Sequence, residues 1–266
     1  MLKKSLLCSL LFANILFASG SEVNVYSQRH YDSDKALFKK FEEKTGIKVN
    51  LITAKAEELV SRLSIEGANS PSDILITADI GNLYEAKERD LLQGVSSKVL
   101  EKNIPAHLRD EGGKWFAITK RARLFVYNPK TINPAHLDDY FSLTKPEFKG
   151  KVITRSSTNA YNKSLLASII AHHGEEKSLE FVKGLVNNFA RDPKGADKDQ
   201  IRAVASGEAD IAIVNSYYLG VMANSGDKVD EEIAKEVKVF FPAQKTTGAH
   251  INISGAGITK FAPNKE

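Results

Sequence analysis

Short apolar runs typical of strands alternate with helical segments along the chain from residue 22 onward. Residues 23–26, 47–52 and 73–76 have the length and the β-branched content of strands, and apolar residues at helical spacing lie between them. Gly46 follows the first of these helical faces and is expected to end that helix. The alternation predicts an α/β fold built from βαβ units around mostly parallel sheets.

The same alternation resumes in the second half of the chain. Two helical faces flank Gly174, a third helical pattern covers residues 201–205, and the apolar run 211–214 is typical of a strand. Residues 115–127, between the two halves, have an extended pattern instead. The sequence therefore predicts two α/β blocks on either side of an extended middle section.

Residues 1–20 have the three regions of a secretory signal peptide. Lys3 and Lys4 give a basic start, an apolar run extends from Leu6 to Phe17, and Gly20 is a small residue before the expected cleavage position. We expect this segment to be removed on export. Its apolar run is too short for a comfortable membrane span, so we expect no stable membrane anchor.

Cys8, the one cysteine of the chain, lies in this signal segment. Its removal leaves a mature protein without a disulfide, a thiol nucleophile, an iron–sulfur cluster or a cysteine-based zinc site. Imidazole, carboxylate or phenol groups must then hold any metal. The formal net charge is +4, and the basic side chains are dispersed among acidic ones, which excludes a basic stripe for nucleic acid.

Four of the eight tyrosines lie at three predicted junctions between a strand and the next helix: Tyr31, Tyr161, Tyr217 and Tyr218. Such junctions are where open α/β sheets bind their ligands. His30 precedes the tyrosine of the first junction. Asn159 and Ser216 are expected to be the N-caps of the helices at the other two, which places the three remaining tyrosines in first helical turns.

A phenol is a poor metal ligand until it ionises, because its reference pKa is about 10. A helix N-terminus favours the phenolate, and a trivalent cation favours it far more. Phenolates with one imidazole suit a hard ion such as Fe³⁺ better than Zn²⁺ or Cu⁺. Four phenolates on Fe³⁺ leave one net negative charge, which Arg121 or Arg123 would offset; alternatively a small anion replaces one phenol near the backbone N–H groups at Asn159.

Most of these residues also have an ordinary structural interpretation. A Tyr-Tyr pair usually packs in a core or an interface, and a lone histidine such as His30 is usually a surface or capping residue. Arg121 and Arg123 have the spacing of the polar face of a half-exposed strand. His172-His173 is expected to be a solvated helix end, since adjacent helical residues point about 100° apart.

Three segments, 23–32, 115–128 and 206–218, resemble the signatures of a known family. This family consists of the periplasmic ferric-ion-binding proteins of bacterial ABC iron importers, which belong to the larger group of type II periplasmic solute-binding proteins. The tyrosine pair after Gly207-Glu-Ala-Asp210 is the most specific part, and the similarity covers essentially the whole mature chain. The resemblance implies a two-lobed type II fold, each lobe a mostly parallel sheet flanked by helices, with the ligand cleft between the lobes.

The resemblance also implies how the chain divides and which residues bind metal. Residues 21–122 with 243–266 would form lobe 1, and residues 123–242 would form lobe 2. Arg123 matches a basic position beside the site. With both His30 and Tyr31 present, the chain resembles the subclass that holds iron with four tyrosines and one histidine, often without a synergistic anion such as carbonate. The residues that match the family's ligands are His30, Tyr31, Tyr161, Tyr217 and Tyr218.

The function implied by this resemblance is transport, not catalysis. The protein would be a periplasmic monomer that captures Fe³⁺ as its transported ligand and delivers it to an ABC permease in the inner membrane. Members of the family continue beyond the point at which this chain stops, with helices on the first lobe. Phe261-Ala-Pro263 is typical of a helix start, so we expect the C-terminal helices to be missing from this sequence.

Two other functions fit the residues. A binding protein of the same fold could hold an organic solute or an oxyanion through Tyr217 and Tyr218, and it would show no visible colour with iron. A secreted hydrolase could use the paired carboxylates Asp138 and Asp139. Nothing in the sequence places those two carboxylates on opposite sides of a cleft.

Overall fold

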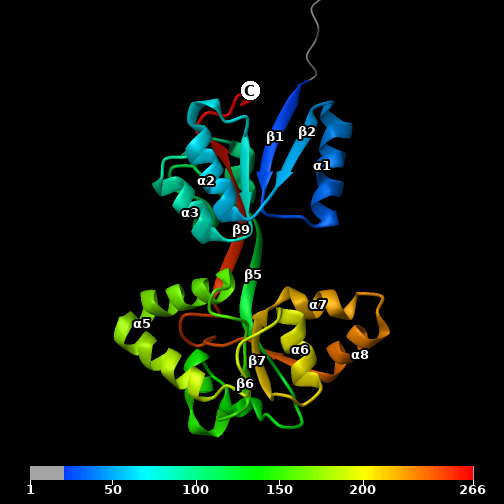
Figure 1. The fold of residues 1–266 in the computed structure, drawn as a ribbon, viewed down its shortest axis with the longest axis vertical. Coiled ribbons are helices and arrows are strands. Elements are labelled where there is room, and N and C mark those ends of the chain that lie inside the picture. Colours follow the sequence, from blue (N-terminus) through cyan, green and yellow to red (C-terminus); the bar gives the residue numbers. More distant parts are fainter. Residues whose placement is uncertain (1–20, 266) are drawn as a thin grey trace, which may run out of the picture.

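The computed structural model describes residues 21–265 and contains two α/β bodies joined by two long strands (Figure 1). The signal peptide expected over residues 1–20 lies outside the described residues. The strands are β1 (Glu22–Ser27), β2 (Lys48–Thr53), β3 (Ile74–Thr77), β4 (Leu92–Gln93), β5 (Phe116–Tyr127), β6 (Val152–Ile153), β7 (Ile211–Asn215), β8 (Lys238–Phe240) and β9 (Ile251–Thr259). The helices are α1 (Asp32–Thr45), α2 (Ala56–Glu66), α3 (Ile80–Glu88), α4 (Lys98–Asn103), α5 (Ala160–Asn187), α6 (Asp197–Ala205), α7 (Tyr217–Ala223) and α8 (Lys228–Glu236).

The sheets are mixed, whereas the sequence predicts mostly parallel ones. In the first body β1 runs parallel to β2 and β3, and β9 pairs antiparallel with β3 and β4. In the second body β6 runs parallel to β7, and β5 pairs antiparallel with β7 and β8. The difference comes from β5 and β9, because each crosses between bodies and runs against its neighbours. Hydrophobic periodicity predicts a strand but not its direction.

The long strand β5 belongs to both sheets. Residues from Phe116 to Ala122 pair with β9, and residues from Arg123 onward pair with β7 and β8. We propose that residues 21–122 with 243–266 form lobe 1 and residues 123–242 form lobe 2, and the change of partner within β5 supports the boundary at 122. The returning segment first contacts lobe 2, since the N–H groups of Ala243 and His250 donate to the Asp138 carbonyl and the Tyr140 hydroxyl, and it then pairs with lobe 1 through β9.

Both lobes bury apolar cores against their sheets. Alternation along β5 directs Phe125 and Tyr127 to one face of the lobe 2 sheet and Leu124 and Val126 to the other, and each face has its own core cluster. Helices therefore cover both sides of this sheet. Lobe 1 has a smaller cluster, built on Tyr26 and on buried residues of α2, β3 and α3.

Glycines end or interrupt helices where the sequence predicts it. Gly46 adopts φ 72° after α1 and its N–H donates to the Glu42 carbonyl at 2.8 Å. Gly174 has φ 78° and ψ 169°, which divides α5 into two helical pieces. Both angles lie in the region that glycine adopts without steric cost. None of the helices within residues 21–265 is long and apolar enough to cross a bilayer.

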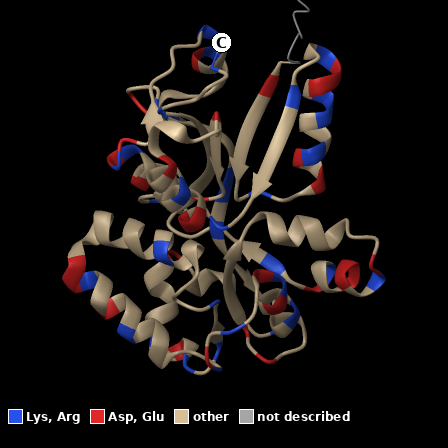
Figure 2. Cartoon of the chain, turned by 45° about the horizontal axis from the view of Figure 1, so that its top comes forward, with Lys and Arg blue, Asp and Glu red and all other residues tan. Residues whose placement is uncertain are grey.

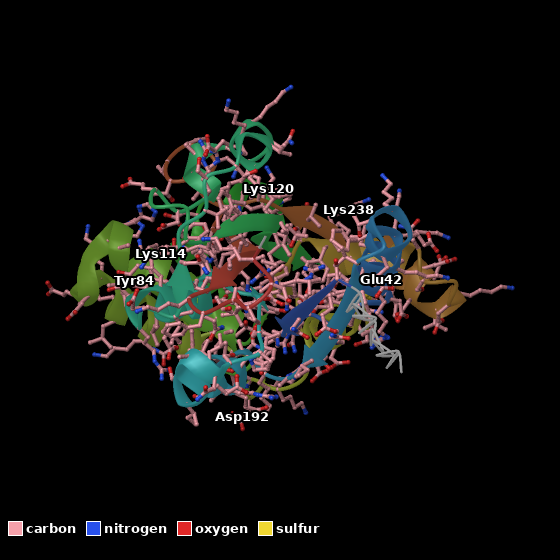
Figure 3. All side chains as sticks on the ribbon, turned by 90° about the horizontal axis from the view of Figure 1, so that it is seen from above. Glu42, Tyr84, Lys114, Lys120, Asp192 and Lys238 are labelled. Atoms are coloured by element: carbon pink, nitrogen blue, oxygen red, sulfur yellow. The ribbon has the colours of Figure 1, made fainter. Side chains whose placement is uncertain are left out.

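The lobes face each other so that particular helices are stacked. The α1 side of lobe 1 lies over α7 and α8, and the α2–α3 side lies over α5 (Figure 1). The view from above agrees, with Glu42 of α1 on the flank of α8 and Tyr84 of α3 on the flank of α5 (Figure 3). Acidic and basic residues are intermixed over α1 and over both lobes (Figure 2). The loop between β1 and α1 therefore faces the start of α7.

Candidate metal centre

A cavity of about 290 Å³ lies between the lobes beside the crossing strands. Tyr31 lines it from lobe 1, Tyr161 and Tyr217 line it from lobe 2, and Arg121 lines it from β5. Three of the four predicted tyrosine ligands thus meet in one cleft, although they come from three separate strand–helix junctions. The other lining residues are Arg29, Ala78, Thr119, Lys120, Val221 and Ser254.

The tyrosine pair begins α7 directly after the buried strand β7. The rings of Tyr217 and Tyr218 stack with their centroids 4.2 Å apart and their planes at 29°. Ser216 stands at the predicted N-cap position of α7, but its side chain does not cap the helix: its backbone is helical, and its hydroxyl accepts a hydrogen bond from the Ala122 N–H at 3.2 Å instead. That bond, together with the Ser216 N–H donating to the Ala122 carbonyl, ties the start of α7 to β5.

Tyr161 is positioned by a helix cap and by two arginines. The Asn159 side chain accepts a hydrogen bond from the Tyr161 N–H at 3.0 Å, so the predicted N-cap of α5 is confirmed. The guanidinium carbon of Arg121 lies 4.9 Å from the centroid of the Tyr161 ring, and that of Arg155 lies 5.3 Å from it. Arginine over an aromatic face is an attractive arrangement, so both cations stabilise the ring in place.

The tyrosine pair is protonated at neutral pH when no metal is bound. Burial raises the pKa of Tyr217 far above its ordinary value, and the neighbouring phenols of Tyr218 and Tyr161 add to this effect. Burial also raises the pKa of Tyr218 to about 12, and the nearby Tyr161, Asp197 and Tyr31 act in the same direction. Only a cation that binds phenolate strongly can displace these protons, which favours a hard ion of high charge.

The lobe 1 half of the centre is more open. The rings of His30 and Tyr31 stack with centroids 5.2 Å apart, and Tyr31 is 41% exposed. Arg29 lies over the Tyr31 ring at 5.3 Å, forms an ion pair with Asp34 at 2.7 Å, and donates to Ser254 of β9. His30 does not line the cleft and is exposed. These two donors therefore depend on a surface loop that Arg29 holds against the crossing strands.

Arg121 and Arg123 are both buried, at 7% and 1% exposure, so the interpretation of a half-exposed strand face is wrong. Arg121 faces the Asp79 carboxylate at 3.5 Å. Arg123 does not line the cleft, because its guanidinium donates to Asp197 at 2.6 Å and to Asn162 at 2.7 Å. Arg121 is thus the nearer cation, and Arg123 braces lobe 2 from behind.

Arg123, Arg155 and Asp197 form a wall of charged side chains behind Tyr161. Arg155 and Asp197 are absent from the sequence-based prediction. Arg155 donates to Asp197 at 2.8 Å, and the Asn215 N–H donates to the same carboxylate at 3.1 Å. Burial opposes the charge on Arg155, yet the hydrogen bond and charge of Asp197 raise its pKa. Arg155 follows the strand β6, so the junction rule could have identified it. Asp197 begins α6, far along the chain, and no local pattern indicates its role.

The other polar pairs lie outside the centre. His172 and His173 are exposed on α5, as expected of a solvated helix segment. Asp139 caps the short 3₁₀ turn after it, accepting a hydrogen bond from the Ser142 N–H at 3.1 Å. Among residues 21–265, no three His, Cys, Asp or Glu side chains gather as a metal site. The candidate centre therefore depends on phenol oxygen.

The chain from residue 26 to residue 266 matches the family described as bacterial extracellular solute-binding protein. Iron uptake protein A1 of Synechocystis is 50% identical over 245 residues, which are 92% of this chain and 68% of that protein. The chain is therefore similar to solute-binding and iron-uptake proteins over almost its whole length.

Two solved structures extend the similarity to the fold. The ferric binding protein from Campylobacter jejuni is 53% identical, with a TM-score of 0.86 over 91% of this chain and 77% of that one. The Trichodesmium protein named IdiA or FutA, solved with iron and citrate ligands, is 47% identical, with a TM-score of 0.87 over 92% of this chain and 78% of that one. The similarity confirms the expected two-lobed type II fold.

Proposed function

The chain belongs to the family of bacterial extracellular solute-binding proteins, and on that premise we propose that it is the substrate-binding component of an ABC importer for ferric iron. One observation carries the proposal: Tyr31, Tyr161 and Tyr217 line a single cleft between the lobes. Phenolate is a donor for a hard trivalent ion. The relatives are iron-uptake and ferric-binding proteins, so the protein is a binding protein and the hydrolase hypothesis is set aside.

The proposed ligands come from both lobes. Lobe 2 supplies the tyrosine pair and Tyr161, and lobe 1 supplies Tyr31 and His30. We propose that His30 enters the coordination sphere when the lobes close. An ion held by both lobes binds the closed state better than the open one and so shifts the population toward it. The stacking of His30 on Tyr31 supports this assignment, because one loop then delivers both donors.

A small anion is a further candidate ligand. The Trichodesmium relative was solved with citrate as well as iron. In this chain Arg29, Lys120 and Arg121 line the cleft, and Arg121 lies over the Tyr161 ring, so we propose that carbonate or a similar anion binds beside Arg121 when present. The Asn159 side chain is already used as the cap of α5, and any contribution at this position comes from backbone N–H groups.

The remaining features of the proposal follow from export. Residues 1–20 would direct the chain to the periplasm and be removed there, and the mature protein would act as a monomer. Closure around iron would align surfaces of both lobes, and a permease in the inner membrane would recognise that form. Each phenol that loses a proton on binding makes the apparent affinity rise about tenfold per pH unit below its pKa.

A visible absorption titration with ferric citrate tests the function. Wild-type protein is expected to develop a saturable phenolate-to-iron band, and the Tyr217→Phe and Tyr218→Phe variants are expected to lose most of it. Tyr84→Phe is a matched control, because Tyr84 is 56% exposed on α3 and outside the cleft. Folded wild-type protein that shows no band, but binds a metal-free organic solute or oxyanion, would contradict the iron proposal.

A further inference from the structure

The wall behind the tyrosines carries two cations and one anion. Arg123 and Asp197 are fully buried, and Arg155 is 19% exposed. One carboxylate oxygen of Asp197 pairs with Arg123 at 2.6 Å and the other pairs with Arg155 at 2.8 Å. A single carboxylate therefore neutralises one of two guanidinium groups, and the wall retains one positive charge.

This surplus charge lies against a proposed ligand. Arg123 is enclosed and also donates to Asn162, whereas Arg155 lies 5.3 Å from the centroid of the Tyr161 ring. Arg121, on the same ring, has Asp79 as its counter-charge. Arg155 is thus the cation that presents the surplus to Tyr161.

The proposed ligands require such a charge. Four phenolates and a neutral imidazole leave one net negative charge on Fe³⁺ and two on Fe²⁺. An uncompensated charge in a partly buried site is costly, and a nearby opposite charge reduces that cost. The same cation favours the ferrous complex more, because that complex carries more negative charge.

We propose that Arg155 is the charge-balancing residue of the ferric site, which acts through Tyr161 and offsets the net negative charge of four phenolates on Fe³⁺. This role rests on the proposed function. It has two consequences: the charge of Arg155 strengthens Fe³⁺ binding, and it raises the reduction potential of the bound iron. Asp197 positions Arg155, and its single negative charge leaves the two arginines with one net positive charge.

The test compares Arg155→Gln with Arg155→Lys, which keeps the charge. Arg191→Gln is the matched control, because Arg191 is 14% exposed in the same lobe and pairs with Glu208 at 2.7 Å, outside the cleft. Arg155→Gln is expected to weaken Fe³⁺ binding about 10- to 100-fold, the range for loss of an outer-shell partner, and to lower the midpoint potential of the iron. Arg155→Lys and Arg191→Gln are expected to stay within about threefold of wild type in competition with citrate.

Asp197→Asn supplies a test of sign, read from the same tyrosinate band in a spectroelectrochemical cell. It leaves the wall with one more positive charge, so the midpoint potential is expected to rise where Arg155→Gln lowers it. A purely structural role predicts that Arg155→Lys binds Fe³⁺ as weakly as Arg155→Gln does. It also predicts that Arg155→Gln and Asp197→Asn shift the midpoint potential in the same direction. Either result overturns the inference. If Arg155→Gln does not fold, the midpoint potential of Asp197→Asn and the iron affinity of Arg155→Lys test the inference in its place.

The two proposals fail in different ways. Folded wild-type protein without an iron band removes the ferric function and the role of Arg155 with it. A wild-type band, together with an Arg155→Gln variant of unchanged affinity and potential, leaves the ferric function standing and overturns the role of Arg155 alone.

Discussion

The two lobes hold their halves of the candidate centre in different ways. In lobe 2, the tyrosine pair follows β7, a strand buried along its whole length, and the wall behind Tyr161 contains the fully buried Asp197. In lobe 1, Tyr31 precedes α1, a helix with no buried residue, and is itself 41% exposed. The lobe 2 ligands are thus anchored in a buried core, whereas the lobe 1 ligands lie on the surface of their lobe.

This difference indicates a division of work between the halves. Donors that are locked by packing and hydrogen bonds lose little freedom when an ion binds, and this describes the lobe 2 tyrosines. Donors on an exposed loop adapt more easily, because regions with few buried contacts have low local stability. We expect the ion to meet lobe 2 first and the lobe 1 donors to close over it.

The largest expected effect concerns the cores themselves. Phe148→Ala in lobe 2 removes a side chain that is 2% exposed and is expected to cost about 3–5 kcal/mol. Phe41→Ala on α1 is expected to cost less than about 1 kcal/mol, because that ring is already 41% exposed. Urea unfolding followed by circular dichroism measures both. Equal losses would remove the contrast between the lobes.

The second prediction concerns the ligands. Tyr218→Phe in lobe 2 is expected to weaken Fe³⁺ binding by more than about 100-fold, beyond the cost of an outer-shell change. Tyr31→Phe in lobe 1 is expected to cost about tenfold, because the remaining donors of an adaptable loop can rearrange. Competition with citrate at fixed pH gives both values, with Tyr84→Phe as control. A larger loss at Tyr31 would make lobe 1 the primary half.

The third prediction is a pH dependence of stability. Burial lowers the pKa of His250 to about 4, and the charges of Arg121 and Arg123 act in the same direction. Below the unfolded pKa of about 6.5, the unfolded chain binds a proton that the folded protein excludes, so stability is present above that pH and is lost as pH falls toward 4. The loss between pH 7 and pH 5 is expected to be about 2 kcal/mol.

His250→Gln isolates this contribution. The free energy of unfolding, measured at both pH values, is expected to change less for the variant than for wild type. His136→Gln is the control, because His136 lies on the surface near Glu147. An identical pH dependence in wild type and His250→Gln would show that this imidazole, which contacts Ser164 of α5 at 3.0 Å, does not link stability to pH.

The smallest expected effect is at the cap of α5. Asn159→Ala is expected to destabilise lobe 2 by about 1 kcal/mol, the usual cost of a lost N-cap. Asn159→Asp keeps an acceptor for the Tyr161 N–H and is expected to remain near wild type. Iron affinity of the alanine variant is expected to change little. A loss of more than tenfold would assign Asn159 to the ion or its anion, instead of to the cap alone.

Much of the fold could be predicted because it depends on local pattern. The strand and helix positions, the breaks at Gly46 and Gly174, and the cap at Asn159 follow from periodicity and backbone preference. The first-turn position of the tyrosines follows from the same junctions. Ser216 was not predictable in this way, since its hydroxyl bonds to Ala122, a residue distant in sequence.

By itself, the sequence determined two α/β blocks, an extended middle section and tyrosines at strand–helix junctions, because these depend on neighbours within a few residues. Only the tertiary structure decided that β5 serves two sheets and that Arg123 is enclosed by Asp197. It also decided that Arg155 carries the spare charge beside Tyr161. Charge balance in a cleft is a property of groups that meet across long sequence separations, and no local pattern records which carboxylate neutralises which cation.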